Sequence, residues 1–220
     1  LPLHAFDLAR QWEAAFRLLQ AGGNVGKVVL RLTAPAPAEE RGGTHLLSGG
    51  TGGLGLLTAR WLAARGAAGL VLASRGGALA RGAGREWAQL AASGAAVRIV
   101  RCDTAEAADV RRLLGGTCGA PLVEGVWHAA GVLADGLLAR QTAATLARVY
   151  GPKAHAAWSV QRRCAALPLR ACALFSSVAA LLGGAAQANY AAANSCLDAL
   201  AESRRAAAQA GVAVQWGPWA

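Results

Sequence analysis

The sequence predicts an α/β protein with a Rossmann-type, doubly wound parallel sheet. Three observations predict this fold. Short apolar segments with the composition of buried strands alternate with helical stretches at the spacing of βαβ units. The first such strand, over residues 44–47, runs into the glycine-rich segment Ser48–Gly55, and a helix over 56–64 follows. Strand, glycine loop and helix in this order form the setting that a dinucleotide-binding loop requires.

The glycine loop is suited to phosphate binding. Its glycines let the backbone approach a pyrophosphate, and the N-terminus of the following helix supplies free N–H groups. A Walker-type loop would end in Lys followed by Ser or Thr, whereas Gly55 is followed by Leu56 and Leu57. For the loop taken alone, an ordinary tight turn stays an alternative, because the chain contains 28 glycines.

The second strand, over residues 69–73, indicates which dinucleotide binds. It ends in Ser74 and Arg75. NAD-binding folds carry an acidic residue here to hold the ribose 2′-hydroxyl, whereas an arginine accommodates the 2′-phosphate of NADP. Arg75 therefore favours NADPH over NADH. The alternative is an ordinary surface charge in a chain rich in arginine.

Four further strands complete the predicted sheet. The third and fourth span residues 96–100 and 122–127, and the fifth and sixth span 171–175 and 212–216. The crossovers between them are expected to be right-handed. Open α/β sheets bind ligands at the carboxyl ends of their strands, and Ser177 lies at this end of the fifth strand.

Four polar residues have a spacing that brings them toward this edge: Lys153, Ser177, Tyr190 and Asn194. Tyr190 and Asn194 are four residues apart in a predicted helix, so they share a face. An ammonium, a hydroxyl, a phenol and an amide in one crevice can protonate a carbonyl oxygen while a hydride arrives at its carbon. Singly, each has a structural explanation as a half-buried tyrosine, a helix cap or a solvated polar group. Together with the glycine loop they favour a reductase site.

Residues 44–220 resemble the ketoreductase domain of polyketide synthases and animal-type fatty acid synthases, within the short-chain dehydrogenase/reductase superfamily. Ordinary members of that superfamily carry the lysine four residues after the tyrosine. Here Asn194 occupies that position and Lys153 lies upstream, which is the arrangement of the synthase-type enzymes. The motifs that carry the resemblance are Ser48–Gly55, His128–Val132, Phe175–Ser177, Gln187–Asn194 and Trp216–Trp219.

The resemblance implies NADPH-dependent reduction of a β-ketoacyl thioester, bound to an acyl carrier protein, to the β-hydroxyacyl thioester. In this role Tyr190 donates its proton to the keto oxygen and Ser177 donates a hydrogen bond to the same atom. Lys153 lowers the pKa of the phenol, since a nearby cation favours the phenolate. Asn194 holds a water molecule or Lys153 in place. The nicotinamide supplies the hydride.

The resemblance also assigns the cofactor-binding positions. Asp103 matches the acid beside the adenine ring, and Pro218 matches the loop after the sixth strand. His128 is expected to be a packed side chain, and no metal site is expected. The full set of cofactor positions is Gly49, Thr51, Gly53, Leu54, Gly55, Ser74, Arg75, Asp103, Ala130, Gly131 and Pro218.

Two positions bear on the stereochemistry of the product. Family members that make the D-configured, B-type alcohol usually carry Leu-Asp-Asp after the fourth strand, where this chain has Leu133-Ala134-Asp135. The opposite type usually carries Trp eight residues before the tyrosine, and this position is Leu182. The resemblance therefore implies a B-type product, with Asp135 and Leu182 as stereocontrol positions.

The first residues belong to a different domain. Apolar residues spaced at three and four predict an amphipathic helix over 8–20, and a strand is predicted over 28–32. Residues 1–33 resemble the C-terminal end of a medium-chain enoylreductase domain, through Ala14–Arg17 and Val25–Val29. Residues 34–43 have the Pro, Ala and Gly content of a linker. The alternative is a docking helix and strand that belong to the ketoreductase itself.

Composition sets outer bounds on partners and location. The chain of 220 residues is 55% hydrophobic, which is ample for one core, and its formal charge is +10. The basic residues are scattered and nearly all arginine, so no nucleic-acid partner is expected, but the charge could steer an acidic carrier domain. Five cysteines without a C-x-x-C pair indicate free thiols in a reducing compartment. No membrane span is expected, and the expected location is the cytoplasm, with an organelle left open.

The chain is expected to be a fragment of a larger polypeptide, with the sheet truncated after the sixth strand. The expected partners are the carrier domain, a neighbouring enoylreductase, and a second copy in a dimeric synthase. A non-catalytic structural scaffold and a free-standing reductase of small ketones are the alternatives. The intact glycine loop and tetrad argue against the scaffold, and Lys153 with Asn194 argues against the free-standing enzyme. Polyketide and fatty acid synthases share these motifs, so that choice stays open.

Overall fold

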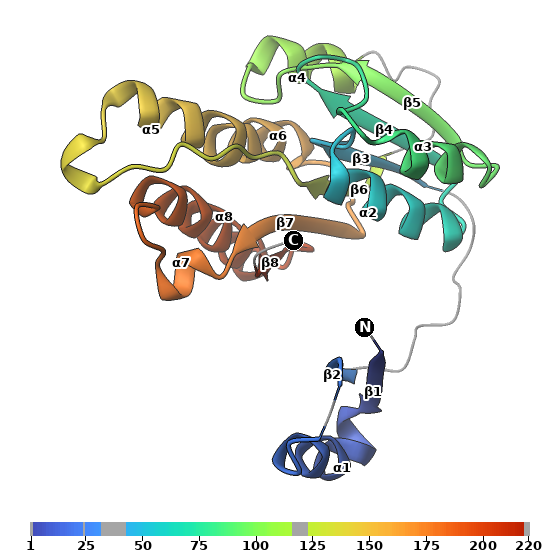
Figure 1. Ribbon diagram of the computed structural model, residues 1–220. Helices are drawn as coiled ribbons and strands as arrows, with labels where there is room; N and C mark the ends of the chain where they lie inside the picture. The colour runs from blue at the N-terminus through green and yellow to red at the C-terminus, as the bar shows by residue number, and fades with distance from the viewer. Residues whose placement is uncertain (1, 24, 32–42, 116–122, 218–220) are drawn as a thin grey trace. The chain divides into compact units, whose positions relative to one another are not determined.

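A computed structural model describes residues 2–23, 25–31, 43–115 and 123–217 of the chain (Figure 1). It divides into two compact units, Leu1–Glu40 and Arg41–Ala220. The predicted linker over residues 34–43 lies, apart from Gly43, outside the described residues.

The first unit is a two-stranded parallel sheet with one helix. Its elements are β1 (Leu3–Asp7), α1 (Leu8–Gln20) and β2 (Lys27–Arg31), and β1 pairs with β2 from Leu3 opposite Lys27 to Asp7 opposite Arg31. The structure confirms the predicted helix with its bounds and places the predicted strand one residue earlier. β1 was not predicted, because His4 and Asp7 interrupt its apolar character.

The second unit contains a six-stranded sheet in which every pairing is parallel. The strand order is β5-β4-β3-β6-β7-β8. Strands β3 to β5 are therefore added toward one edge of the sheet, and strands β6 to β8 toward the other edge. This confirms the Rossmann-type, doubly wound fold. The strands are β3 (Thr44–Ser48), β4 (Gly69–Ser74), β5 (Ala96–Arg101), β6 (Val123–His128), β7 (Ala171–Ser177) and β8 (Val212–Trp216).

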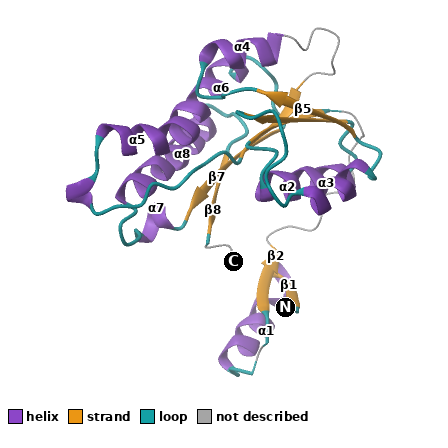
Figure 2. Cartoon of the chain, turned by 45° about the horizontal axis from the view of Figure 1, so that its top comes forward, coloured by secondary structure: helices purple, strands orange, loops and turns teal. Residues whose placement is uncertain are grey.

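Helices cover both faces of this sheet (Figure 2). One core packs α2 and α3 against alternate strand residues such as Leu47 and Leu72. The other core packs α4, α6 and α8 against the opposite face, through residues such as Leu46 and Val71. Successive side chains of a strand point to opposite faces, so both cores draw on the same strands. The helices are α2 (Gly53–Ala64), α3 (Gly84–Ala91), α4 (Ala107–Gly115), α5 (Ala143–Tyr150), α6 (Ala156–Cys164), α7 (Ala179–Leu182) and α8 (Ala188–Ala206).

Two boundaries differ from the prediction in ways that affect the site. The helix predicted over 56–64 begins at Gly53, because the backbone N–H of Leu56 already bonds to the carbonyl of Gly52 at 2.9 Å. The strand predicted over 171–175 continues through Ser177. The last residues of the glycine loop are therefore helical, and Ser177 is held by the sheet itself.

Among the described helices, none is long and apolar enough to cross a membrane.

Candidate active site

The glycine loop lies at the switch point, between the ends of β3, β4 and β6. Gly49 has a φ of +68°, and a Cβ there would lie 2.7 Å from the backbone of Ala130. A Cβ on Gly55 would lie 2.4 Å from the carbonyl oxygen of Gly49. The loop is thus folded back on the first turn of α2, and only glycine fits at these two positions.

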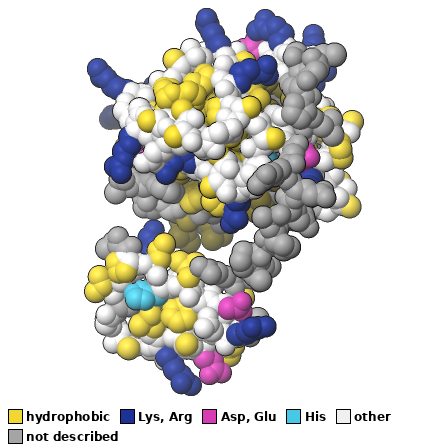
Figure 3. All heavy atoms as spheres, turned by 90° about the vertical axis from the view of Figure 1, so that its right-hand side faces the viewer, with side chains coloured by type: hydrophobic (Ala, Val, Ile, Leu, Met, Phe, Trp, Pro, Cys, Tyr) yellow, Lys and Arg dark blue, Asp and Glu magenta, His cyan; other side chains and the backbone are white. Residues whose placement is uncertain are grey.

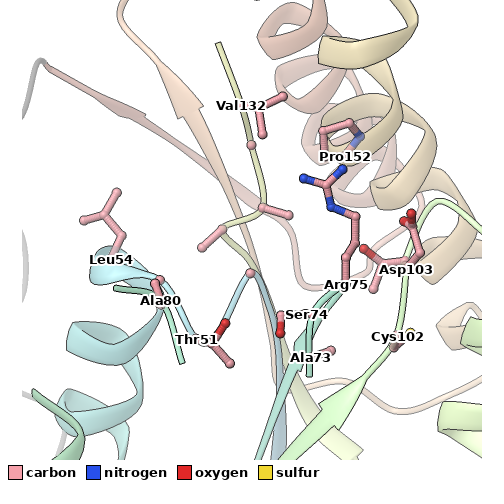
Figure 4. Close-up of a pocket in the computed structure, with 18 of the residues that line it drawn as sticks. Thr51, Leu54, Ala73, Ser74, Arg75, Ala80, Cys102, Asp103, Val132 and Pro152 are labelled. Atoms are coloured by element: carbon pink, nitrogen blue, oxygen red, sulfur yellow. The ribbon is translucent and has the colours of Figure 1, made fainter. Parts of the chain in front are cut away.

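A cavity of about 520 Å³ opens above this loop. Figure 4 shows Arg75 extending from the end of β4, with Asp103 beside it and Pro152 near its guanidinium group. Thr51 and Leu54 contribute from the glycine-loop side. Every predicted cofactor residue except Pro218 lines this cavity, and Pro218 lies outside the described residues.

The residues of this first cavity fit a dinucleotide. Free N–H groups at the start of α2 suit a pyrophosphate, and a Cβ on Gly53 would meet open space, so the backbone there is accessible. The carboxylate of Asp103 accepts a hydrogen bond from the N–H of Ala105 at 3.0 Å, which stabilises the turn after β5. The exposed guanidinium group of Arg75 can meet a phosphate bidentately.

A second cavity of about 540 Å³ adjoins the first. Leu54, Ala129, Gly131 and Val132 line both. Ser177, Tyr190 and Lys153 line only the second. A ligand that passes from the first cavity into the second would therefore present one end to the glycine loop and the other to three of the four predicted catalytic residues.

A π-helical turn places Lys153 in this cavity. Residues Gly151–His155 form one turn of π-helix between α5 and α6, so the helix carries a bulge at Lys153. Pro152 has no backbone N–H to give to the helix, which favours an irregular turn here, and π-bulges are frequent at functional sites. Pro152 lines the first cavity and Lys153 the second.

The Lys153 ammonium is buried and tightly held. The residue is 5% exposed, and its Nζ donates to the carbonyl oxygen of Phe175 at 2.9 Å. Nζ also lies 5.2 Å from the centroid of the Tyr190 ring. Burial lowers the pKa of Lys153 to about 8, and the negative charge of Asp198 opposes that effect. Lys153 is therefore charged near neutrality and stands beside the phenol.

Ser177 and Tyr190 face the cavity from two different elements. Ser177 ends β7, and its Oγ accepts a hydrogen bond from the N–H of Ala179 at 3.2 Å, so its hydroxyl proton can be donated elsewhere. Tyr190 lies in the first turn of α8, and the side chain of Asn189 accepts its backbone N–H at 2.7 Å. The two hydroxyl groups come from a strand and a helix.

Asn194 lies behind the cavity wall. It is fully buried, and its Nδ2 donates to the carbonyl oxygen of Tyr190 at 2.8 Å. The structure thus brings Lys153, Ser177 and Tyr190 to one cavity, and it places Asn194 one helical turn beneath Tyr190. Asn194 does not line the cavity.

Comparison with known proteins decides the family. The profile of the KR domain family matches residues 43–220. The chain belongs to the KR domain family. It is 44% identical over 220 residues to Polyketide synthase GfsB of Streptomyces halstedii, covering 100% of this chain and 4% of that protein. It is 46% identical over 222 residues to Spectinabilin polyketide synthase system protein NorB of Streptomyces orinoci, covering 100% of this chain and 10% of that protein.

Solved structures support the same assignment. A structure described as an A1-type ketoreductase is 40% identical to this chain, with a TM-score of 0.78, and the match covers 86% of this chain and 40% of that one. The KR domain is thus the ketoreductase domain of polyketide synthases, an oxidoreductase family. This chain spans a tenth or less of the two synthases named above.

Neither of the two predicted stereocontrol positions, Asp135 and Leu182, lines the second cavity. Asp135 accepts a hydrogen bond from Nε2 of Gln187 at 3.3 Å, and Asn189 donates to the carbonyl oxygen of Ala134 at 2.8 Å. The loop after β6 is therefore tied to the start of α8, next to Tyr190. Leu182 is 79% exposed at the end of α7 and does not line the cavity.

Some residues of the site were not predicted. Gln187 lines the second cavity. Its position three residues before Tyr190 was a sequence signal that could have identified it as a site residue. Pro152 and Thr104 line the first cavity, and nothing in their local sequence indicates this. Asp198 acts electrostatically on Lys153, and its position eight residues after Tyr190 in one helix was a signal that could have identified it.

His128 is a packed side chain that links the two halves of the KR domain site. It is 1% exposed. Its Nδ1 contacts the hydroxyl of Ser48, and its Nε2 lies 3.0 Å from the carbonyl oxygen of Lys153. In the neutral ring, Nε2–H donates to that carbonyl and Nδ1 accepts from Ser48. Burial and the charge of Lys153 lower the pKa of His128 to about 4.

We expect this histidine to make the domain acid-sensitive. The folded-state pKa of about 4 lies below the unfolded value of about 6.5, so the unfolded chain binds more protons between these values. The contribution is complete above pH ~6.5 and is lost as the pH falls toward ~4. From pH ~7 to ~5 the free energy of unfolding should drop about 2 kcal/mol more in the wild type than in His128→Gln. Urea denaturation at both pH values measures this, and equal drops would contradict it.

Proposed function

We propose that this KR domain reduces a β-ketoacyl thioester to the β-hydroxyacyl thioester with NADPH. The acyl group would be carried on the phosphopantetheine arm of an acyl carrier protein. The observation that carries the proposal is the pair of adjoining cavities. One contains the glycine loop and Arg75, the other contains Ser177, Tyr190 and Lys153, and Gly131 lines both.

The residues of the second cavity can provide acid catalysis. When NADPH is bound, it supplies the hydride. Ser177 and Tyr190 donate hydrogen bonds to the keto oxygen, and the proton moves from the Tyr190 hydroxyl to that oxygen as negative charge develops on it. The Lys153 ammonium, beside the ring, stabilises the phenolate that forms. A Cβ on Gly131 would lie 2.8 Å from Cε of Lys153, so this glycine leaves room for the lysine.

The experiment that tests this function is NADPH consumption by the protein that carries this chain, with a β-ketoacyl thioester offered free and on a carrier protein. Turnover with formation of the β-hydroxyacyl product supports the proposal. NADPH binding without turnover of either substrate would favour the structural scaffold instead. From Asp135 and Leu182 we also propose that the product is the D-configured, B-type alcohol. Analysis of the product on a chiral phase tests this, and mainly L-alcohol would overturn it.

Arg75 is proposed to select NADPH over NADH. We expect Arg75→Ala to raise the KM for NADPH roughly ten- to hundredfold, the value of a charge-assisted hydrogen bond to phosphate, and to leave the KM for NADH unchanged. Arg81→Ala is the matched control, since Arg81 is exposed nearby and does not line the cavity. An equal effect on both cofactors would argue against this role.

The proposed partners follow from the family and the charge. On the face shown in Figure 3, the Lys and Arg side chains of the larger unit are spread rather than gathered in one patch. This distribution fits weak steering of an acidic carrier domain better than it fits a nucleic-acid binding surface. Association with the carrier that does not depend on salt would count against such steering.

We propose a cytoplasmic, dimeric synthase. Cell fractionation and sedimentation of the protein that carries this chain test the location and the dimer.

We further propose that residues 1–33 end an enoylreductase domain. Support comes from the separate compact unit that contains them and from synthase matches that span the whole chain. NADPH-dependent reduction of an enoyl thioester by the longer protein tests this. Absence of enoyl reduction in a protein with active ketoreduction would favour the docking-segment alternative.

A further inference from the structure

The helix that carries Tyr190 also carries two polar residues behind the site. Tyr190, Asn194 and Asp198 follow one another at intervals of four residues in α8, so their side chains share one face. Tyr190 lines the second cavity. Asn194 and Asp198 lie one and two turns further along the helix, in the direction of β8.

Two oxygen atoms on this face are buried and, within the described part of the chain, receive no hydrogen bond: Oδ1 of Asn194 and Oδ1 of Asp198. The remaining polar atoms of both side chains are bonded. Nδ2 of Asn194 donates to the carbonyl oxygen of Tyr190, and Oδ2 of Asp198 accepts from Nε2 of Gln215 at 3.0 Å. Because buried polar atoms almost always have a hydrogen-bond partner, we expect a donor next to each of these oxygens.

Lys153 is a buried cation that lines the same cavity as Tyr190. Its ammonium has three protons, and one of them goes to the carbonyl oxygen of Phe175. Asp198 acts on Lys153 electrostatically. A buried water molecule typically makes about three hydrogen bonds. One such water, donating to both Oδ1 atoms and accepting from the ammonium, would give each oxygen a donor and use a second ammonium proton.

We propose that Asp198 is a positioning residue of the reductase site. Together with Asn194 and a buried water molecule, it holds the Lys153 ammonium charged and directed at the Tyr190 ring. Gln215 on β8 orients the carboxylate by bonding its other oxygen. The part that Lys153 plays in the reaction rests on the proposed function, whereas the electrostatic interaction between Asp198 and Lys153 does not.

The other titratable groups around Lys153 do not supply this negative charge. His128 on β6 is neutral near pH 7 because burial lowers its pKa to about 4. Tyr190 and Cys196 share α8 with Asp198, and Tyr150 and His155 flank Lys153 on its own helical segment. From β7 the contact is the Phe175 carbonyl. Within the described residues, Asp198 is the carboxylate whose charge acts on Lys153.

The chain allows a direct measurement, because Lys27 and Lys153 are its only lysines. A short pulse of acetic anhydride labels the neutral amine, so the rate of Lys153 acetylation against pH, read by peptide mass spectrometry, gives its midpoint. Lys27 in the first unit is the internal reference. The variants are Asp198→Asn, the charge-conserving Asp198→Glu, and Glu202→Gln, which removes an exposed carboxylate one turn further along α8.

We expect the Lys153 midpoint to fall by about half a unit to one unit in Asp198→Asn. It should stay near the wild-type value in Asp198→Glu and Glu202→Gln. The higher of the two pKa values in the pH profile of kcat/KM for ketoreduction should fall with the midpoint. Unchanged midpoints in Asp198→Asn, or the same fall in Asp198→Glu or Glu202→Gln, would overturn the proposal. Acetylation needs neither NADPH nor substrate, so its outcome is separate from success or failure of the proposed function.

Discussion

Tyr190→Phe should lose about 10²–10⁴-fold in kcat for ketoreduction, the range that a general acid contributes. The change removes one hydroxyl group and keeps the ring that lies beside the Lys153 ammonium. Binding of NADPH should therefore be unchanged, because the cofactor contacts lie mainly in the first cavity. Stopped-flow or steady-state NADPH oxidation measures the loss, and a fluorescence titration measures the binding.

The chain supplies a matched control for this substitution. It contains two tyrosines, and Tyr150, at the end of α5, lines neither of the two cavities. Tyr150→Phe removes the same group and should keep most of the activity. If Tyr190→Phe keeps more than about a tenth of the wild-type rate, or if both variants lose activity equally, Tyr190 is not the general acid.

Gly55→Ala should weaken NADPH binding roughly ten- to hundredfold. The added Cβ would lie 2.4 Å from the carbonyl oxygen of Gly49 and 2.6 Å from the Cα of Gly50. Both are backbone atoms, so the loop and the first turn of α2 must move apart, at a cost of about 1–3 kcal/mol. That movement displaces the N–H groups proposed to bind the pyrophosphate. Isothermal titration with NADPH measures the dissociation constant.

Gly84→Ala separates this effect from a general response to alanine. Gly84 begins α3, and a Cβ there would meet no atom within 4 Å. Its variant should bind NADPH like the wild type and melt at an equal or slightly higher temperature. An unchanged dissociation constant in Gly55→Ala would show that the loop tolerates a side chain, and the proposed cofactor geometry would then be wrong.

Much of the fold follows from local patterns in the sequence. The strand β3, the glycine loop and α2 could be predicted because apolar periodicity and glycine spacing are properties of adjacent residues. Ser177 and Tyr190 could be placed for the same reason, since one ends an apolar run and the other shares a helix with Asn194. β1 escaped prediction because its two polar residues hide the pattern, and parallel pairing with β2 stabilises it.

The site depends on more than these patterns. Lys153 lies 24 residues before Ser177 in the sequence, and its approach to Tyr190 depends on a π-helical turn that propensities do not predict. The burial of Lys153, which lowers its pKa to about 8, also arises from packing. Pro152 reaches the first cavity through the same turn. None of these features has a local signature.

The sequence determined the fold class, the glycine loop and the identity of the polar residues available for chemistry, because these depend on residues close together in the chain. The tertiary structure decided which of those residues meet. It brought Lys153, Ser177 and Tyr190 to one cavity, moved Asn194 behind it, and turned a carboxylate oxygen of Asp198 inward. Such placements depend on long-range packing. The burial of a polar side chain, and the charges around it, come from residues that are distant in the sequence.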